Sequence, residues 1–473
     1  MTEWSESIYI DGWRPGSAGT LDVTEVATGE TLAVAGLAGA DDVDPAVRVA
    51  EAAQREWAAR GAEERAEGLE RLRDVIARHA ERLSCWLVRE AGATRQKAER
   101  ELRAARAELD HATNLARSLA GRQVTTEERQ HVVNRLAVGV VAVITPFNAP
   151  LVLAMRAVAP ALAVGNAVIL KPDPRTAVSG GLQYPALLED AGLPGGLLSV
   201  LPGGADVGAR LSDHPGIRAV LFTGSTEAGH KVGEAAGRTL KRVGLELGGN
   251  NPVIVLEDAD LEAAATCAVT SSFLHSGQIC MAAGQYLVHE AVYGEFVELI
   301  VEKAARLRVG DPWRDNTVDM GPIIDDRSVA RLARMVERSV GEGAVLRLGG
   351  TPTGRFFPAT VLSDIATEAP AWCDEAFGPI APLRPVASTE EALTSIRRSA
   401  FGLVAAIHTV DIDRAQALAA RIPAGTIRIN DVTNHDDPRT PMVGWKSSGN
   451  GAAFGGAEML DLITTVKLTS VRR

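Results

Sequence analysis

From residue 138 onward, short runs of apolar and mostly β-branched residues alternate with longer segments of helical character. The run at residues 138–144, VGVVAVI, contains no polar residue, which is typical of a strand buried on both faces of a sheet. Similar runs lie at 167–170, 197–201, 219–222 and 243–245, and helical segments at 151–164 and 176–191 separate them. This alternation predicts an α/β fold with a parallel, doubly wound sheet that binds ligands at the carboxyl ends of its strands.

The chain on both sides of this region continues the pattern. Residues 41–119 are predicted to form helices, the first capped by Asp44 ahead of Pro45. Residues 249–444 read as a second α/β unit. We expect helices at 260–273 and 290–307, strands at 253–256 and 403–409, a structured loop at 441–456, and strand-like segments at 122–135 and 460–471.

Composition excludes several classes of protein. The 473 residues carry a formal net charge of -11, which disfavours binding to nucleic acid. No run of about 18 apolar residues is present, so we expect no membrane span, and residues 1–12 lack the features of a signal peptide. The cysteines, Cys85, Cys267, Cys280 and Cys373, are scattered, and His275 and His435 have no suitably spaced partners. We therefore expect no metal site and no disulfide framework, as suits the reducing cytoplasm.

A glycine-bearing turn follows the strand predicted at 219–222. In the sequence FTGSTEAG, which follows this strand and opens a predicted helix, Gly224 and Gly229 lie five positions apart. Glycines allow the backbone to approach a phosphate, and a helix N-terminus offers N–H donors and the positive end of the helix dipole. The turn therefore predicts a site for a phosphate-bearing cofactor.

Three further residues supply the parts of a covalent reaction. Cys280, in Gly-Gln-Ile-Cys, offers a thiol nucleophile, Glu246 offers a carboxylate that can activate water, and Asn148 offers an amide that can hold an oxyanion. Because a free cysteine has a pKa of about 8.5, a nucleophilic one needs a helix N-terminus or a nearby proton acceptor. Together these residues can oxidise an aldehyde through a thioester on Cys280 that water hydrolyses.

The order of these motifs resembles the aldehyde dehydrogenase superfamily from about Gly12 to the C-terminus. The resemblance implies an NAD(P)-binding domain at residues 1–120 and 138–248 and a catalytic domain at 249–447. It also implies an oligomerisation element at 121–137 and 460–473, which would add a strand to a partner subunit in a homodimer or homotetramer. The backbone N–H of Cys280 would join Asn148 in holding the oxyanion.

The resemblance also implies the cofactor site. Lys171 would reach the adenine-side ribose, Glu375 would hold the nicotinamide ribose, and Phe377 would pack on the nicotinamide. Where a glutamate usually follows three positions after the lysine, this chain has Pro174, with Arg175 beside it. A 2′-phosphate would then be repelled less, so we expect NADP to be accepted alongside NAD. The implied cofactor-binding residues are Thr145, Pro146, Phe147, Lys171, Arg175, Gly208, Phe222, Gly224, Ser225, Gly229, Leu247, Glu375 and Phe377.

Several phrases resemble the benzaldehyde and vanillin dehydrogenase branch, among them 148–160, 171–176, 246–251, 273–275 and 449–456. Ala149 and Met442 stand where aromatic residues are common, and Arg156 replaces a frequent tryptophan, which leaves space for an aromatic aldehyde. Ile279 and Met281 would flank the thiol. Alternatively, Arg156 would bind the carboxylate of a semialdehyde.

Two positions depart from the resemblance together. Ala157 and Ala453 stand where many members have a lysine and a glutamate thought to pass protons to the general base. We expect Glu246 to exchange its proton with water by another route, so that Ala157→Lys alone would not speed deacylation. Two other readings stay open: a CoA-acylating enzyme, which the presence of Glu246 disfavours, and a catalytically silent binding protein.

Overall fold

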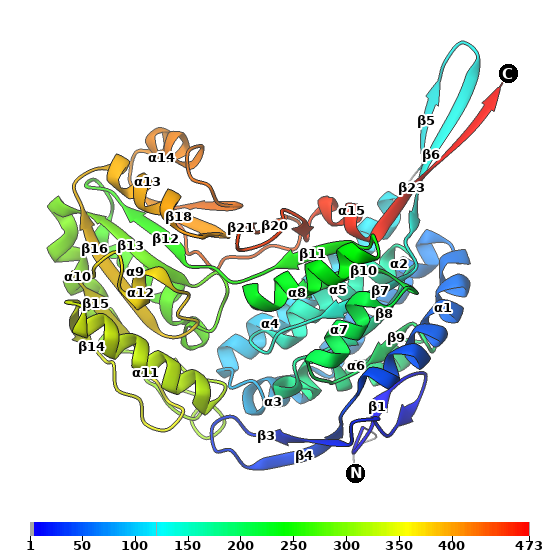
Figure 1. Cartoon of the computed structure of the whole chain (residues 1–473), viewed down its shortest axis with the longest axis horizontal. Coiled ribbons are helices and arrows are strands. Elements are labelled where there is room, and N and C mark those ends of the chain that lie inside the picture. The colour runs from blue at the N-terminus through cyan, green and yellow to red at the C-terminus, as the bar shows by residue number, and fades with distance from the viewer. Residues whose placement is uncertain (1–3, 120, 473) are drawn as a thin grey trace.

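The computed structural model describes residues 4–119 and 121–472, and its two seven-stranded sheets lie in separate lobes (Figure 1). The first sheet contains the predicted strands as β7 (Val140–Ile144), β8 (Ala167–Lys171), β9 (Leu198–Val200), β10 (Ile217–Thr223) and β11 (Arg242–Glu246), all parallel. Their order is β11-β10-β7-β8-β9, so the order in which successive strands join the sheet reverses between β7 and β10. That reversal leaves a crevice at the carboxyl ends of these strands, the usual ligand site of such sheets. The predicted α/β fold class is confirmed.

The N-terminal residues extend this sheet in a way that the sequence pattern did not reveal. β1 (Ile8–Tyr9) pairs antiparallel with β9, and β2 (Trp13–Arg14) pairs with β1. A separate hairpin follows, formed by β3 (Thr20–Thr24) and β4 (Thr31–Gly36).

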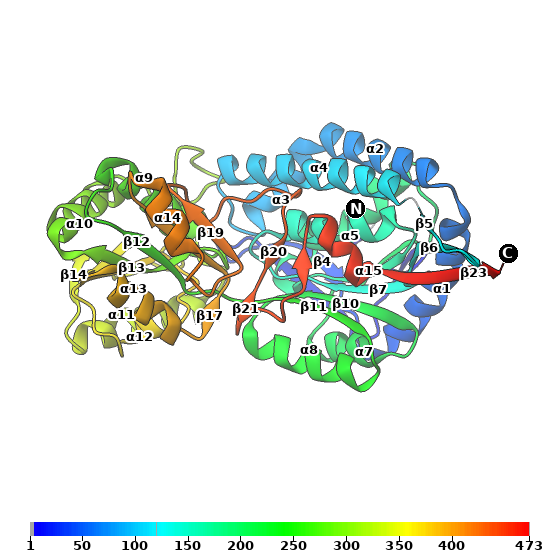
Figure 2. The ribbon, with the colours of Figure 1, turned by 90° about the horizontal axis from the view of Figure 1, so that it is seen from above.

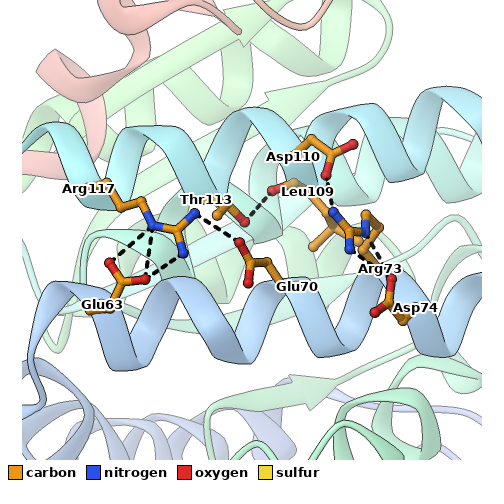
Figure 3. A network of polar contacts seen from close by, with 8 residues as sticks. All are labelled: Glu63, Glu70, Arg73, Asp74, Leu109, Asp110, Thr113 and Arg117. Atoms are coloured by element: carbon orange, nitrogen blue, oxygen red, sulfur yellow. Dashed lines mark hydrogen bonds and ion pairs between the residues drawn. The ribbon is translucent and has the colours of Figure 1, made fainter.

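Helices cover both faces of the first sheet. Figure 2 shows α2 and α4 on one face and α7 and α8 on the other. The helices are α1 (Val43–Ala59), α2 (Ala62–Arg78), α3 (Ala80–Arg89), α4 (Arg95–Ser118), α5 (Pro150–Ala163), α6 (Tyr184–Asp190), α7 (Ala205–Asp213) and α8 (Thr226–Arg238). Surface ion pairs join α2 to α4, where Arg117 reaches Glu63 and Glu70, and Arg73 reaches Asp110 (Figure 3).

Two of the helix predictions were wrong in detail. Helix α1 begins at Val43 after a 3-10 turn, Ala40–Asp42, so Asp44 lies inside the helix instead of capping it. The helix predicted at 176–191 is broken into a 3-10 turn (Pro174–Thr176), a π-helical segment (Val178–Leu182) and α6. The buried carboxylate of Glu90 accepts hydrogen bonds from the backbone N–H groups of Val178 and Ser179, at 2.9 and 2.6 Å, and so replaces the partners of a regular helix.

The second sheet has the order β14-β15-β16-β13-β12-β18-β19 and is parallel except for the edge strand β14. Its strands are β12 (Asn251–Val255), β13 (Ala283–His289), β14 (Val345–Leu348), β15 (Thr360–Ser363), β16 (Ile380–Val386), β18 (Val404–His408) and β19 (Thr426–Ile429). Its helices are α9 (Leu261–Phe273), α10 (Glu290–Ala305), α11 (Asp326–Gly341), α12 (Pro370–Cys373), α13 (Thr389–Arg398) and α14 (Ile412–Ala419). Four residues, 247–250, connect β11 of the first sheet to β12 of the second.

A three-stranded arm projects from the first lobe (Figure 1). It consists of β5 (Arg122–Thr125), β6 (Arg129–Ala137) and β23 (Thr464–Arg472), with β6 in the centre. The terminal strand was predicted from residue 460, but residues Leu460–Ile463 form the short helix α15. The predicted loop at 441–456 contains the short strands β20 (Met442–Val443), β21 (Trp445–Lys446) and β22 (Ala453–Phe454), and β21 pairs with β17 (Phe401–Gly402).

The division into cofactor, catalytic and oligomerisation units stays a prediction, and residues 1–3, 120 and 473 of those units lie outside the described residues. In the described ranges, none of the helices has both the length and the apolar composition needed to cross a membrane. Among the same residues, no three histidine, cysteine or acidic side chains gather as metal ligands would.

Candidate active site

Two adjoining cavities, of about 540 and 840 Å³, open at the carboxyl ends of the strands of the first sheet. They share four lining residues, Ile144, Lys171, Phe222 and Ala228. Gly208 lines the larger cavity, and Gly229 lies outside both. The other predicted cofactor residues line the smaller one, namely Thr145, Pro146, Phe147, Lys171, Arg175, Phe222, Gly224, Ser225, Leu247, Glu375 and Phe377.

The turn between β10 and α8 has the properties of an anion-binding helix start. Ser225 is the N-cap, and its hydroxyl accepts a hydrogen bond from the backbone N–H of Ala228 at 3.3 Å. A Cβ at Gly229 would lie 2.4 Å from the side chain of Leu247, so a glycine is required for α8 to pack this close. The first N–H groups of α8 therefore face a cavity that fits the phosphates of a dinucleotide.

At the junction of the cavities, Lys171 ends β8 and is buried, which lowers its pKa. Pro174 lines the larger cavity. The guanidinium of Arg175 binds the carboxylates of Asp173 and Asp325, at 2.8 and 2.7 Å, and stacks over the ring of Phe147. The guanidinium of Arg175 is thus already paired with two carboxylates. Position 174, beside it, is a proline and so adds no further negative charge.

Glu375 and Phe377 also line the smaller cavity. The carboxylate of Glu375 accepts a hydrogen bond from the backbone N–H of Gly249 at 2.9 Å, and burial raises its pKa to about 7. Phe377 has a left-handed backbone (φ 45°) and packs edge-on against Phe147, with ring centroids 5.7 Å apart. Glu375 thus offers a hydrogen-bond acceptor and Phe377 an aromatic wall, groups that would suit the nicotinamide half of a cofactor.

Cys280 lies in the turn between the 3-10 segment Leu274–Gly277 and β13, and it lines the smaller cavity. The side chain of Asn251 donates hydrogen bonds to the carbonyls of Cys280 and Ala282, at 2.9 and 2.7 Å, and so fixes this turn. No helix begins at Cys280, so the nearby proton acceptor is the alternative that the structure favours. Burial and the carboxylates of Glu375 and Glu246 raise the pKa of the thiol to about 12.

Glu246 ends β11 and is buried. Its Oε1 accepts a hydrogen bond from the backbone N–H of Gly444 at 3.2 Å, while its Oε2 has no partner among the described residues. Burial raises the pKa of this carboxyl to about 8. The unpartnered oxygen is therefore available to orient a water molecule.

Asn148 lies in the loop between β7 and α5, is buried, and lines the same cavity as Cys280. Its backbone carbonyl accepts a hydrogen bond from the Nζ atom of Lys97 at 2.8 Å. Asn148, after β7, and Cys280, before β13, thus line one cavity, whereas Glu246, at the end of β11, does not line it but is near enough to act on the pKa of Cys280.

Cys280 also packs against an apolar cluster, which contains Ile279, Met281, Leu403, Val404 and Met442. Ala149 is the N-cap residue of α5. Arg156 is buried, and its guanidinium pairs with the carboxylates of Glu108, at 2.6 Å, and Asp436.

Ala157 and Ala453 stand where many family members have the lysine and glutamate thought to pass protons to the general base. Ala157 is buried, and Ala453 lies in β22.

Sequence reasoning missed several residues around the site. Lys97, Glu101 and Glu108 of α4 were not singled out from the sequence, and all three are buried. The spacing of Lys97 and Glu101 is that of an ordinary surface ion pair, so no local signal distinguished them. Asp436 and Gly444 lie in long connections whose path cannot be read from periodicity.

Comparison with known proteins places this site in a family. A model of the aldehyde dehydrogenase family matches residues 13–469. The chain belongs to that family. Like its relatives, this aldehyde dehydrogenase is an NAD(P)-dependent oxidoreductase that acts on aldehydes.

Among curated relatives, a vanillin dehydrogenase from an Amycolatopsis strain is 44% identical over 99% of this aldehyde dehydrogenase and 97% of that protein. A benzaldehyde dehydrogenase [NAD(+)] from Pseudomonas putida is 42% identical over 98% and 95%. Among solved structures, an NADP-dependent enzyme of E. coli has a TM-score of 0.96 at 31% identity, covering 100% of this chain and 99% of that one. A Staphylococcus aureus betaine aldehyde dehydrogenase in complex with NAD+ has a TM-score of 0.95 at 28% identity, covering 99% and 95%.

Proposed function

We propose that this enzyme oxidises an aromatic aldehyde of the benzaldehyde or vanillin type to its carboxylic acid, through a thioester on Cys280. The observation that carries the substrate class is the identity above 40% to a vanillin and a benzaldehyde dehydrogenase over nearly the full chain. The apolar cluster beside the thiol, with Met281 and Met442, supports an apolar substrate.

The proposed chemistry assigns one task to each residue. The sulfur of Cys280 attacks the aldehyde carbon, and the amide of Asn148 with the backbone N–H of Cys280 holds the resulting oxyanion. The attack needs a proton acceptor because the thiol is protonated at neutral pH, and the nearby carboxylate of Glu246 can take that role. NAD(P), when bound, accepts hydride from the substrate carbon. After Glu246 has passed the thiol proton on to water, its carboxylate takes a proton from the water molecule that hydrolyses the thioester and releases the acid.

The semialdehyde alternative is disfavoured by the contacts of Arg156. Its guanidinium already binds Glu108 and Asp436, so a substrate carboxylate would have to displace one of these carboxylates. The CoA-acylating alternative is disfavoured because a base for hydrolysis, Glu246, is buried close enough to Cys280 to act on its pKa and has one carboxylate oxygen without a partner among the described residues.

The deciding experiment measures formation of reduced nicotinamide with benzaldehyde, vanillin, succinic semialdehyde and hexanal, each with NAD and with NADP. We expect the highest kcat/KM with the two aromatic aldehydes. Cys280→Ala should abolish turnover, and Cys267→Ala, which removes a half-buried thiol of α9, should retain it. A preference for succinic semialdehyde would reject the aromatic assignment, and an active Cys280→Ala enzyme would reject the mechanism.

We propose that both NAD and NADP are used, because Pro174 places no carboxylate near the site assigned to the adenine-side ribose. Pro174→Glu should then lower kcat/KM for NADP more than for NAD. A wild-type enzyme that strongly prefers NAD would contradict this proposal.

Two further proposals concern the surroundings of the enzyme. We propose that the arm of β5, β6 and β23 joins subunits in a homodimer or homotetramer, which is supported by its two open edges and the exposed side chains of Val466, Leu468 and Val471. We also propose a cytoplasmic location, which is supported by the four free thiols.

A further inference from the structure

Helix α4 carries three charged side chains on a buried face. Lys97, Glu101 and Glu108 are 7%, 4% and 1% exposed, and their spacing places them on one side of the helix. The surface ion pairs of Asp110 and Arg117 occupy the opposite side, where α4 meets α2 (Figure 3). Glu108 pairs with Arg156, whereas Lys97 and Glu101 reach the start of α5, directly beside Asn148.

The start of α5 has no cap of its own. Its N-cap residue, Ala149, has no polar side chain, and Pro150, the first helical residue, has no N–H. The next two N–H groups, of Leu151 and Val152, both donate to the Oε1 atom of Glu101, at 2.8 and 3.2 Å. Glu101 of α4 therefore serves as the missing cap of α5.

Lys97 fixes the residue just before this helix. Its Nζ donates one hydrogen bond to the Oε2 atom of Glu101 and another to the backbone carbonyl of Asn148, the latter at 2.8 Å. One buried ion pair thus binds the backbone at two points, the carbonyl of Asn148 and the N–H groups at the start of α5. The side chain of Asn148 leaves this fixed backbone toward the cavity that Cys280 lines.

We propose that Lys97 and Glu101 are positioning residues that hold the amide of Asn148 where the oxyanion forms. The inference rests on the proposed role of Asn148. A buried ion pair contributes little net stability compared with apolar residues of the same volume, so a purely structural role does not require it. Catalysis does require it, because displacement of a catalytic group by about 1 Å can cost about 100-fold in rate.

The test is a double-mutant cycle on the first step of the reaction. The burst of reduced nicotinamide in a single turnover with benzaldehyde and NAD is measured for wild type, Asn148→Ala, Lys97→Met and the double variant. We expect Asn148→Ala to lower the burst rate about 100-fold or more, and Lys97→Met to lower it about 10- to 100-fold. In the Asn148→Ala background, Lys97→Met should cost less than about threefold, because the group it positions is gone.

Arg103→Met is the matched control, because it removes a cation from the exposed face of the same helix. It should leave the burst rate unchanged, and the dissociation constant of NAD should be unchanged in Lys97→Met. Should Lys97→Met fail to fold, Lys97→Gln with Glu101→Gln serves in its place, because it keeps an acceptor for Leu151 and leaves no buried charge unpaired.

Three outcomes would each overturn either the positioning role of Lys97 and Glu101 or the proposed role of Asn148. A full-rate Lys97→Met enzyme would overturn the inference, and so would a Lys97→Met loss that is fully additive with Asn148→Ala. A full-rate Asn148→Ala enzyme would instead overturn the proposed role of Asn148 itself.

Discussion

At the scale of single residues, the carboxyl of Glu246 couples activity to pH. Its pKa of about 8 means that most molecules hold it protonated at neutral pH, and a general base works only when ionised. We therefore expect the rate of thioester hydrolysis to rise with pH through about 8. The measurement is kcat against pH under conditions where hydrolysis limits turnover, with Glu246→Gln showing no such rise.

The raised pKa of Glu246 also predicts how the stability of the protein depends on pH. Between its ordinary pKa of 4.5 and its folded value of about 8, the folded protein binds a proton that the unfolded chain does not. The contribution of Glu246 to the free energy of unfolding therefore falls as pH rises across that window. Glu246→Gln should melt at a higher temperature than wild type at about pH 9 and show no such advantage at about pH 4. Equal melting temperatures at both pH values would contradict the raised pKa.

Arg156 offers a second prediction at this scale. Arg156→Met leaves Glu108 buried without its cation, and breaking a buried pair in this way typically costs about 3–5 kcal/mol. Urea unfolding should show this loss, and Glu108→Leu in the same protein should restore part of it. Arg117→Met removes a surface pair of α4 and should change stability little. A comparable loss in both variants would show that burial of the pair is not the cause.

At the scale of elements, the approach of α8 to the segment after β11 depends on Gly229. A Cβ there would lie 2.4 Å from the side chain of Leu247, so Gly229→Ala must displace either that side chain, which lines the cavity, or the start of α8. We expect weaker binding of NAD, with little change in the rate of the chemical step once the cofactor is saturating. Isothermal titration would measure the affinity, and Gly237→Ala, at an open position of the same helix, is the control.

The accuracy of prediction from the sequence differs from element to element. Strands buried on both faces, such as β7 and β8, were predicted to within two residues because an unbroken β-branched run has few other structures open to it. The segment at 176–191 was mispredicted because a distant carboxylate, that of Glu90, determines its hydrogen bonding. The candidate catalytic residues were found from motifs, whereas Lys97, Glu101 and Glu108 act through tertiary contacts that no spacing in the sequence encodes.

At the scale of the whole molecule, the arm provides the prediction for assembly. Leu468 of β23 is 60% exposed on this arm, a fraction that suits burial against another subunit. Leu468→Asp should shift the sedimentation coefficient toward that of a monomer. Leu240→Asp, which changes a leucine that is 94% exposed at the end of α8, should leave the assembly intact. A wild-type protein that sediments as a monomer would contradict the proposed role of the arm.

The connector of four residues between the two sheets restricts how genes for such a protein can change in length. Glu246 ends β11 and Asn251, which fixes the backbone of Cys280, begins β12. One inserted residue would add up to about 3.5 Å of chain between them, enough to separate the base from the nucleophile. Insertions and deletions should therefore survive selection in the exposed connection at 313–317 and be eliminated at 247–250, whatever aldehyde a descendant of this gene comes to use.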